Sequence, residues 1–309
     1  MRVDVLLATR NSARFLDPML DSLAAQDHRD FHLIIGDDAS SDDTLARVER
    51  KREGFANPVE VIARTEPSGS ARANFSDLIE RSRGDYVFLA DHDDIWLSHK
   101  ISTALSALSE AERALGADTP ILFHTDLSVV DADGAPLADS LWRFKRLDPA
   151  AGVTFRRALV EATVTGCACA FNGALRRRLG RIPPEAVMHD WWIALLACGL
   201  GRVLYDPRPS IQYRIHGANV SNPQKVSFLR AALDRDRYRK MHWRFHQRTR
   251  QAAALVERHG DALPPSARRV AERFAAMGEV GPVTRRAIFL RDRFFVSDHW
   301  RNIAYMAFM

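Results

Sequence analysis

Apolar runs alternate with helix-like segments over the first ninety residues of this 309-residue chain. Two of the runs, 3–8 and 86–90, are nearly unbroken series of apolar side chains, which is the pattern of strands covered on both faces. Further runs span 31–36 and 59–63, and segments with a helical apolar stripe lie between all four. This βαβαβαβ order predicts an α/β fold with a doubly wound, mostly parallel, Rossmann-like sheet.

Polar side chains follow three of these strands. Thr9 follows the first, Asp37 and Asp38 the second, and Asp91 and Asp93 the fourth. Because parallel sheets of this kind bind ligands at the carboxyl ends of their strands, we expect these side chains in one crevice. The acids after the fourth strand are like charges that repel unless a cation or hydrogen-bond donors hold them. They either supply hard oxygen ligands to a divalent metal or cap the next helix.

Composition narrows the class of protein. The chain is 46% hydrophobic and 27% charged, which is ordinary for a soluble globular protein. No stretch reaches the roughly 18 apolar residues of a membrane span, and the polar N-terminus does not resemble a signal peptide. Three cysteines in apolar surroundings indicate reduced thiols in the cytoplasm, and the Cys167-x-Cys169 pair is not expected to bind a metal. Neither GxxxxGK[ST] nor GxGxxG occurs, so any diphosphate needs a metal or basic side chains.

Charge divides the chain near residue 223. From Lys225 onward there are 18 Lys and Arg against 8 Asp and Glu, whereas residues 1–224 carry a net charge of −5. Helical patterns over 228–258, 266–277 and 284–308 fill this basic region. Its last segment places on one face the apolar residues Ile288, Phe289, Phe295, Val296, Trp300, Ile303 and Met306. Such a face lies on an anionic membrane, packs on the domain that holds the predicted sheet, or binds a second subunit as a homodimer.

Several ordered motifs resemble family 2 glycosyltransferases of the GT-A fold; they span 3–12, 34–44, 84–96, 188–192 and 213–221. The Asp-x-Asp-Asp-x-Trp form at 91–96 is similar to bacterial rhamnosyltransferase-like members. The resemblance covers 1–222 and implies a GT-A domain there, with a basic helical region over 223–309. The sequence departs from the usual motifs at three positions: Arg10 replaces an aromatic residue, Ala39 replaces glycine, and His92 stands where glutamine is frequent.

The resemblance implies a metal site. Asp91 and Asp93 would hold Mn²⁺ or Mg²⁺ on the donor's diphosphate, and Asp91 would also contact the nucleotide. His216 matches a later metal ligand, and one imidazole among oxygens tilts the preference toward Mn²⁺. The alternative for His216 is a hydrogen-bonding loop histidine. Asp94 and Trp96 are expected to brace the loop.

The resemblance also implies a catalytic base, Asp190, whose pKa the neighbouring Trp191 and Trp192 would raise by desolvation. The alternative is that Asp190 caps the helix starting there. Gly166, Trp191 and Trp192 are expected on the acceptor side. The small Gly166 would let the backbone approach the sugar, or it marks a bulge.

For the nucleotide, the resemblance points to Asp38, with Asp37 as the alternative, as the acceptor of the N3–H of uracil or thymine. Thr9 would line the same pocket. Arg72 would contact the base or the phosphates, and a solvated arginine is the alternative.

Together these features predict an inverting, metal-dependent glycosyltransferase. Its donor would be dTDP-rhamnose or a UDP-sugar, and its acceptor a saccharide or lipid-linked saccharide in surface polysaccharide biosynthesis. We expect it in the cytoplasm or at the inner face of the cell membrane, with no nucleic-acid partner. The alternatives are a sugar-nucleotide pyrophosphorylase and a non-catalytic carbohydrate-binding protein. The pyrophosphorylase would need a Gly-rich loop, which the segment 9–13 lacks.

Overall fold

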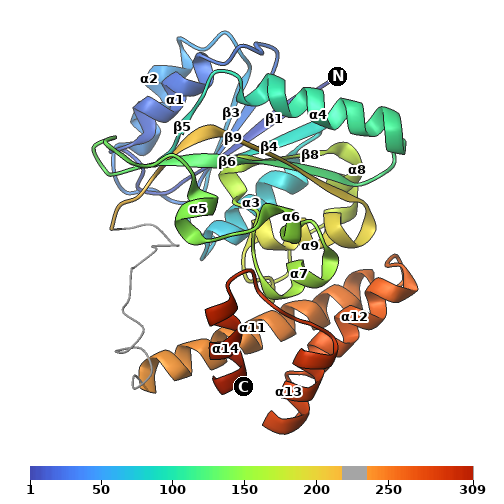
Figure 1. Cartoon of the computed structure of the whole chain (residues 1–309). Coiled ribbons are helices and arrows are strands. Elements are labelled where there is room, and N and C mark those ends of the chain that lie inside the picture. The colour runs from blue at the N-terminus through green and yellow to red at the C-terminus, as the bar shows by residue number, and fades with distance from the viewer. Residues whose placement is uncertain (218–234, 309) are drawn as a thin grey trace.

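The computed structural model describes residues 1–217 and 235–308 (Figure 1). The end of the last motif, 218–221, lies outside the described residues. The predicted helix start at 228–234 also lies outside them.

A single sheet organises the described chain. Its strands are β1 (Val3–Thr9), β2 (His32–Asp37), β3 (Val59–Ala63), β4 (Tyr86–Asp91), β5 (Ile95–Trp96), β6 (Ile121–Val130), β7 (Pro136–Ala138), β8 (Cys169–Asn172) and β9 (Arg202–Arg214). They lie in the order β3-β2-β1-β4-β8-β6-β9-β5, with β7 beside β6. The first four predicted strands pair in parallel, β8 runs antiparallel to both neighbours, and β9 is parallel to β6. The predicted mostly parallel, doubly wound sheet is confirmed.

Helices cover both faces of this sheet (Figure 1). They are α1 (Leu16–Ala24), α2 (Thr44–Arg52), α3 (Ala71–Arg81), α4 (Lys100–Leu115), α5 (Leu141–Lys145), α6 (Pro149–Gly152), α7 (Phe155–Val160), α8 (Gly173–Leu179), α9 (His189–Leu200), α11 (Arg235–His259), α12 (Pro265–Ala276), α13 (Pro282–Arg291), α14 (His299–Phe308) and the 3₁₀ helix η1 (Gly166–Ala168). Along β1, Val5 and Leu7 join one hydrophobic core with α1 and α4, while Leu6 and Ala8 join another with α3 and α9. Both faces of β1 are thus buried, which explains why its sequence is an almost unbroken series of apolar residues.

Strand register brings the predicted polar side chains to one edge. Ala8 on β1 lies opposite Asp91 on β4, and Thr9 lies opposite Asp37 on β2. The carboxyl ends of three parallel strands thus meet where the sequence places its acids.

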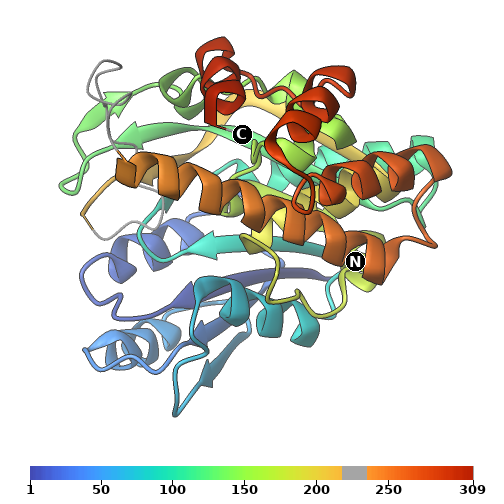
Figure 2. The same ribbon diagram turned by 90° about the horizontal axis from the view of Figure 1, so that it is seen from below.

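The C-terminal helices share a core with the sheet. α11 runs across the underside of the molecule, and α12 to α14 lie beside it (Figure 2). Phe245, Leu255, Phe274 and Phe289 belong to the same hydrophobic cluster as Leu6 on β1. Of the three predicted contacts for this region, packing on the domain of the sheet is therefore present in the structure.

One predicted helix, 284–308, is wrong, because α13 ends at Arg291 and α14 begins at His299. Arg293 adopts a positive φ of 54°, and the N–H of Phe294 donates to the carbonyl of Phe289 at 3.1 Å. This bond is the helix-ending turn usually built on glycine. The predicted apolar face is divided as a result: Phe289 is buried, whereas Trp300 on α14 is 60% exposed.

Two local features adjoin the sheet edge. The segment before Cys169 is not a strand, because Gly166–Ala168 forms η1. The first helix begins at Leu16 without a side-chain cap, and Asn11 instead accepts a hydrogen bond from the N–H of Ser41 at 2.9 Å. Asn11 thus ties two loops together.

Candidate active site

The loop after β4 is fixed by its last acid. Asp94 is buried, and its Oδ1 accepts the N–H of Arg214 on β9 at 3.1 Å. The Nε of Arg214 donates to the backbone carbonyl of Asp93 at 3.0 Å. Trp96 is buried beside Phe88, with ring centroids 6.1 Å apart. Asp94 and Trp96 therefore brace the loop, as the sequence predicts.

Asp93 and His216 meet in the structure although 123 residues separate them. The Nε2 of His216 donates to Oδ2 of Asp93 at 2.8 Å. The ring of Phe15 packs on the imidazole at 4.8 Å between centroids. The fold therefore brings together two side chains that the family resemblance assigns to one cation.

Carboxylates crowd this edge of the sheet. Burial, together with the negative charges of Asp93 and Asp190, raises the pKa of Asp91 to about 7. Burial also raises the pKa of Asp94 well above its ordinary value, with Asp93 and Asp91 adding to the effect. A divalent cation would offset this repulsion, and carboxylate oxygens with one imidazole form a donor set that Mn²⁺ or Mg²⁺ accepts. The residues present thus fit a metal.

Thr9 and Asp37 are joined to each other at the ends of β1 and β2. Thr9 Oγ1 donates to Oδ1 of Asp37 at 2.9 Å, and the N–H of Ser40 donates to Oδ2 at the same distance. Both Thr9 and Asp37 are buried. Because both carboxylate oxygens of Asp37 already accept hydrogen bonds, this side chain shapes the loop between β2 and α2.

Asp38 has a different environment. Its Oδ1 accepts the N–H of Ser68 at 2.6 Å. Arg10 lies 3.7 Å from Oδ2, and Arg64 lies 3.7 Å from Oδ1. Two guanidinium groups therefore compensate the charge of Asp38, and Arg10, which departs from the usual motif, is one of them.

Arg72 begins α3 but reaches toward the start of α9. Its Nη1 donates to the backbone carbonyls of Pro184 and Ala186, the latter at 2.7 Å. These bonds tie α3 to the segment that leads into α9. The alternative of a solvated arginine is wrong. The predicted nucleotide contact would require the guanidinium to bind the nucleotide in addition to these two carbonyls.

Asp190 is held at the first turn of α9. Its Oδ2 accepts the N–H of Gly166 at 3.0 Å, and its Oδ1 accepts the N–H of Trp191 at 2.7 Å. The helix is capped by Met188, so Asp190 lies inside the helix and not at the predicted cap. The N-terminal end of a helix still favours its negative charge.

Gly166 allows this approach. A Cβ at this position would lie 2.8 Å from Nε2 of His189 and 3.4 Å from Cβ of Asp190. No side chain fits there without movement of His189. The close contact between η1 and the start of α9 therefore requires this glycine. The sequence had instead suggested that Gly166 lets the backbone approach the sugar or marks a bulge.

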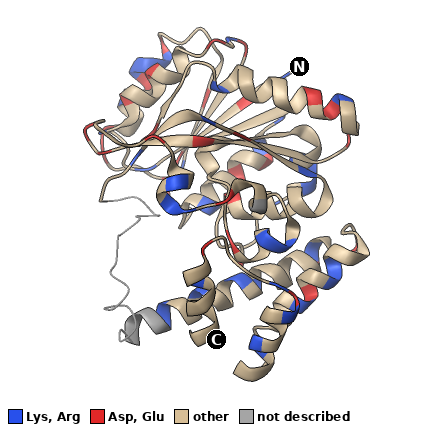
Figure 3. Ribbon diagram, viewed as in Figure 1, with Lys and Arg blue, Asp and Glu red and all other residues tan. Residues whose placement is uncertain are grey.

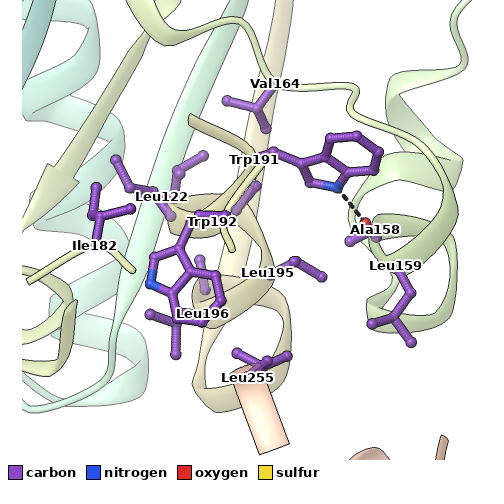
Figure 4. Close-up of a cluster of buried hydrophobic side chains, with 14 of the residues drawn as sticks. Leu122, Ala158, Leu159, Val164, Ile182, Trp191, Trp192, Leu195, Leu196 and Leu255 are labelled. Atoms are coloured by element: carbon purple, nitrogen blue, oxygen red, sulfur yellow. Dashed lines mark hydrogen bonds between the residues drawn. The ribbon is translucent and has the colours of Figure 1, made fainter. Parts of the chain in front are cut away.

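The two tryptophans after Asp190 lie in the core (Figure 4). Trp192 has no exposed surface, and Trp191 donates from its indole N–H to the carbonyl of Ala158 at 2.5 Å. The predicted acceptor contact of Trp192 is therefore corrected to a packing role, because α9 turns this ring inward beside Leu195 and Leu196. Trp191 is almost as deeply buried.

Sequence reasoning missed several groups beside Asp91 and Asp190. The ligand atoms of Asp91, Asp94 and Cys167 all lie within 4.8 Å of one another, and the Cys167 thiol has a raised pKa because it is buried near acids. Lys145 on α5 is close enough to Asp190 to be affected by its charge. Asp94 belongs to the motif at 91–96, but no motif assigns Cys167 or Lys145 to this site, because three separate segments bring these residues together.

Known proteins resemble this chain. The model of the family described as "Glycosyl transferase family 2" matches residues 4–178. The dTDP-rhamnosyl transferase RfbG of Shigella flexneri is 26% identical over 246 residues, which cover 76% of this chain and 81% of that protein. The putative teichuronic acid biosynthesis glycosyltransferase TuaG of Bacillus subtilis is also 26% identical, with 81% of this chain and 95% of that protein covered.

Solved structures share the fold. Staphylococcus aureus TarS 1–349 in complex with UDP matches with a TM-score of 0.57 and 18% identity, over 90% of this chain and 71% of that chain. The mannosyltransferase PcManGT from Pyrobaculum calidifontis, in complex with GDP-Man and Mn²⁺, matches with a TM-score of 0.52 and 20% identity, over 99% and 84%. These matches support the predicted GT-A fold. Because the family model covers more than half of the chain, the protein belongs to glycosyl transferase family 2.

Proposed function

We propose that the protein is an inverting, metal-dependent glycosyltransferase that moves a sugar from a nucleotide diphosphate to an acceptor hydroxyl. One observation carries the proposal. Asp190 lies close enough to raise the pKa of Asp91 through its charge, while Asp93 contacts His216. A candidate base and three candidate metal ligands therefore meet at the carboxyl edge of the sheet, where such folds bind ligands.

Asp91, Asp93 and His216 would hold Mn²⁺ or Mg²⁺, and the imidazole favours Mn²⁺. When bound, the cation supplies positive charge that neutralises the departing diphosphate. The hydrogen bond between His216 and Asp93 keeps both side chains oriented toward the same place. The buried Asp94 holds the loop that presents Asp91 and Asp93.

Asp190 would take the proton from the attacking hydroxyl of the acceptor. The backbone N–H groups of Gly166 and Trp191 hold one oxygen each and fix the orientation of the carboxylate. A fixed carboxylate within reach of the hydroxyl is what general base catalysis requires. The side chain is partly exposed, so an acceptor can reach it.

Asp38 would accept the N3–H of uracil or thymine, since Asp37 is already occupied by Thr9 and Ser40. This supports dTDP-rhamnose or a UDP-sugar as the donor. The similar RfbG is named as a dTDP-rhamnosyl transferase, and the similar TarS binds UDP, whereas PcManGT binds GDP-Man. We therefore place the donor among the pyrimidine nucleotide sugars, with a saccharide or lipid-linked saccharide of a surface polysaccharide as the acceptor.

The C-terminal helices would meet an anionic membrane surface at the cytoplasmic side, where a lipid-linked acceptor lies. Trp243 on α11 and Trp300 and Ile303 on α14 are exposed, and Lys and Arg line α11 to α13 (Figure 3). Exposed aromatic and basic side chains together suit such a surface. Among the described residues, no helix has the length and apolar character needed to cross a membrane. Sedimentation with phosphatidylglycerol vesicles but not with phosphatidylcholine vesicles would support this contact; equal sedimentation would contradict it.

The enzymatic proposal is tested with a panel of nucleotide sugars and Mn²⁺, in which nucleotide release is measured for the wild type and Asp190→Asn. We expect release from a pyrimidine nucleotide sugar and a rate about 10²–10⁴ times lower in the variant. Asp118→Asn is the control, because that side chain is fully exposed. Release from no sugar would favour a non-catalytic carbohydrate-binding protein. An undiminished rate in Asp190→Asn would overturn only the base assignment.

A further inference from the structure

Lys145 is a cation near Cys167 and Asp190, and it extends from the short helix α5. Ser140 precedes α5 and binds both Asp126 and the N–H of Arg143, at 2.5 and 3.1 Å. Leu141 at the start of α5 is buried. These contacts fix the backbone of α5, and the position of the Lys145 side chain is therefore determined by the fold.

The ammonium of Lys145 makes no hydrogen bond or ion pair with residues 1–217 or 235–308 whose side chains the structure describes. It lies 5.6 Å from the centroid of the Tyr213 ring on β9. Burial lowers its pKa, while Cys167 and Asp190 favour its charged form. A half-buried cation without a hydrogen-bonded counter-ion is unfavourable, and an arriving anion would relieve this cost.

Four arginines near the carboxyl edge of the sheet already have partners. Arg10 and Arg64 lie beside Asp38, and Arg72 binds backbone carbonyls. Arg214 donates to the carbonyl of Asp93. Lys145 therefore differs from these arginines in being available to a ligand.

The neighbourhood of Lys145 indicates which ligand. The charge of Asp190, the residue proposed to act on the acceptor hydroxyl, favours the charged form of Lys145, whereas Asp93 and His216 belong to the proposed diphosphate site. Arg143 and Arg146 are exposed on and beside the same helix, which makes α5 strongly basic (Figure 3). The positive field around α5 attracts an anionic substrate.

We propose that Lys145 binds an anionic group, a phosphate or a carboxylate, of the acceptor. The inference rests on the proposed function, because it takes Asp190 to mark the acceptor side. It adds that the acceptor is acidic, a property that neither the fold nor the metal ligands specify. Lys145 is a specificity-determining residue in this account.

The test measures binding and not turnover, so it gives an answer even if no nucleotide sugar is consumed. The full chain is saturated with Mg²⁺ and UDP, and inorganic phosphate, glucuronate and glucose are then titrated by calorimetry. We expect the wild type to bind phosphate or glucuronate more tightly than glucose, and which of the two binds identifies the anion. Lys145→Met should weaken that anion about tenfold or more, while Lys145→Arg should lose less because it keeps the charge.

Two measurements separate binding from other roles. The affinity for UDP should stay within about twofold in Lys145→Met, because the diphosphate is assigned elsewhere; a tenfold loss would move Lys145 to the donor side and overturn the proposal. The Tm should not fall, because methionine fills the same space without a charge to desolvate. Lys51→Met is the matched control, since Lys51 is already paired with Asp21. The proposal would also be overturned if Lys145→Met and Lys145→Gln bound both phosphate and glucuronate as tightly as the wild type.

Discussion

Two carboxylates at opposite edges of the same sheet have opposite electrostatic properties. Asp4, at the amino end of β1, accepts hydrogen bonds from Arg2, Ser82 and the N–H groups of Arg83 and Gly84. Burial alone would raise its pKa, but these hydrogen bonds lower it below the ordinary value. The acid is thus stabilised in its charged form by the fold.

Asp91, at the carboxyl end of β4, lies among other acids. Burial together with Asp93 and Asp190 raises its pKa to about 7. The neighbouring loops also hold unfavourable backbone, since Asn11 and Ala39 have positive φ values of 48° and 57°. The amino edge therefore contributes to stability, whereas the carboxyl edge lowers stability in a way that a bound ligand can compensate.

The largest expected effect concerns the amino edge. Asp4→Asn should lower the free energy of unfolding by about 3 kcal/mol at pH 7, because one amide cannot accept from all the donors that face Asp4. Activity per folded molecule should stay unchanged, since this edge lies opposite the site. Urea unfolding measures the loss. Asp85→Asn, on an exposed side chain of the same edge, is the control and should have a small effect. A stable but inactive Asp4→Asn protein would break the distinction between the edges.

A divalent cation should stabilise the carboxyl edge. Mn²⁺ at 100 times its Kd should add about 2.7 kcal/mol to the free energy of unfolding. The gain should disappear in Asp93→Asn and persist in Asp118→Asn. Thermal unfolding with and without EDTA measures this. Equal gains in all three proteins would show that the cation binds elsewhere.

The two acids should also respond to pH with opposite sign. The folded protein holds the Asp91 proton more tightly than the unfolded chain, so metal-free protein loses stability as the pH rises from about 4 to 7. Asp4 has a lowered pKa, and its contribution is lost instead as the pH falls below about 4. Asp91→Asn should therefore be more stable than the wild type in EDTA at pH 8, by on the order of 2 kcal/mol, and the difference should shrink at pH 5. A difference that stays constant between these two pH values would contradict the account of Asp91.

Sequence patterns predicted the carboxyl edge because local information determines it. Apolar runs identify the strands, and the rule for parallel sheets then places Thr9, Asp38 and Asp91 together. The remaining features depend on long-range packing. Nothing local shows that Trp192 packs in the core while Asp190 stays partly exposed near Asp91, and Lys145 carries no motif. The break after α13 was missed because arginine, and not glycine, adopts the left-handed conformation at residue 293.

The smallest expected effect tests whether the carboxyl edge stores backbone strain. Ala39 lies in the loop between β2 and α2 with φ of 57°, a region in which glycine has no steric penalty. Ala39→Gly should raise the free energy of unfolding by up to about 1 kcal/mol, part of the gain being offset by the greater freedom of glycine in the unfolded chain. Ala107→Gly within α4 is the matched control and should lower it by about 1 kcal/mol, because there the same substitution only adds entropy to the unfolded chain. Urea unfolding at pH 7 measures both variants. If both substitutions destabilise the protein equally, Ala39 is unstrained, and the instability of the carboxyl edge then comes from its charges alone.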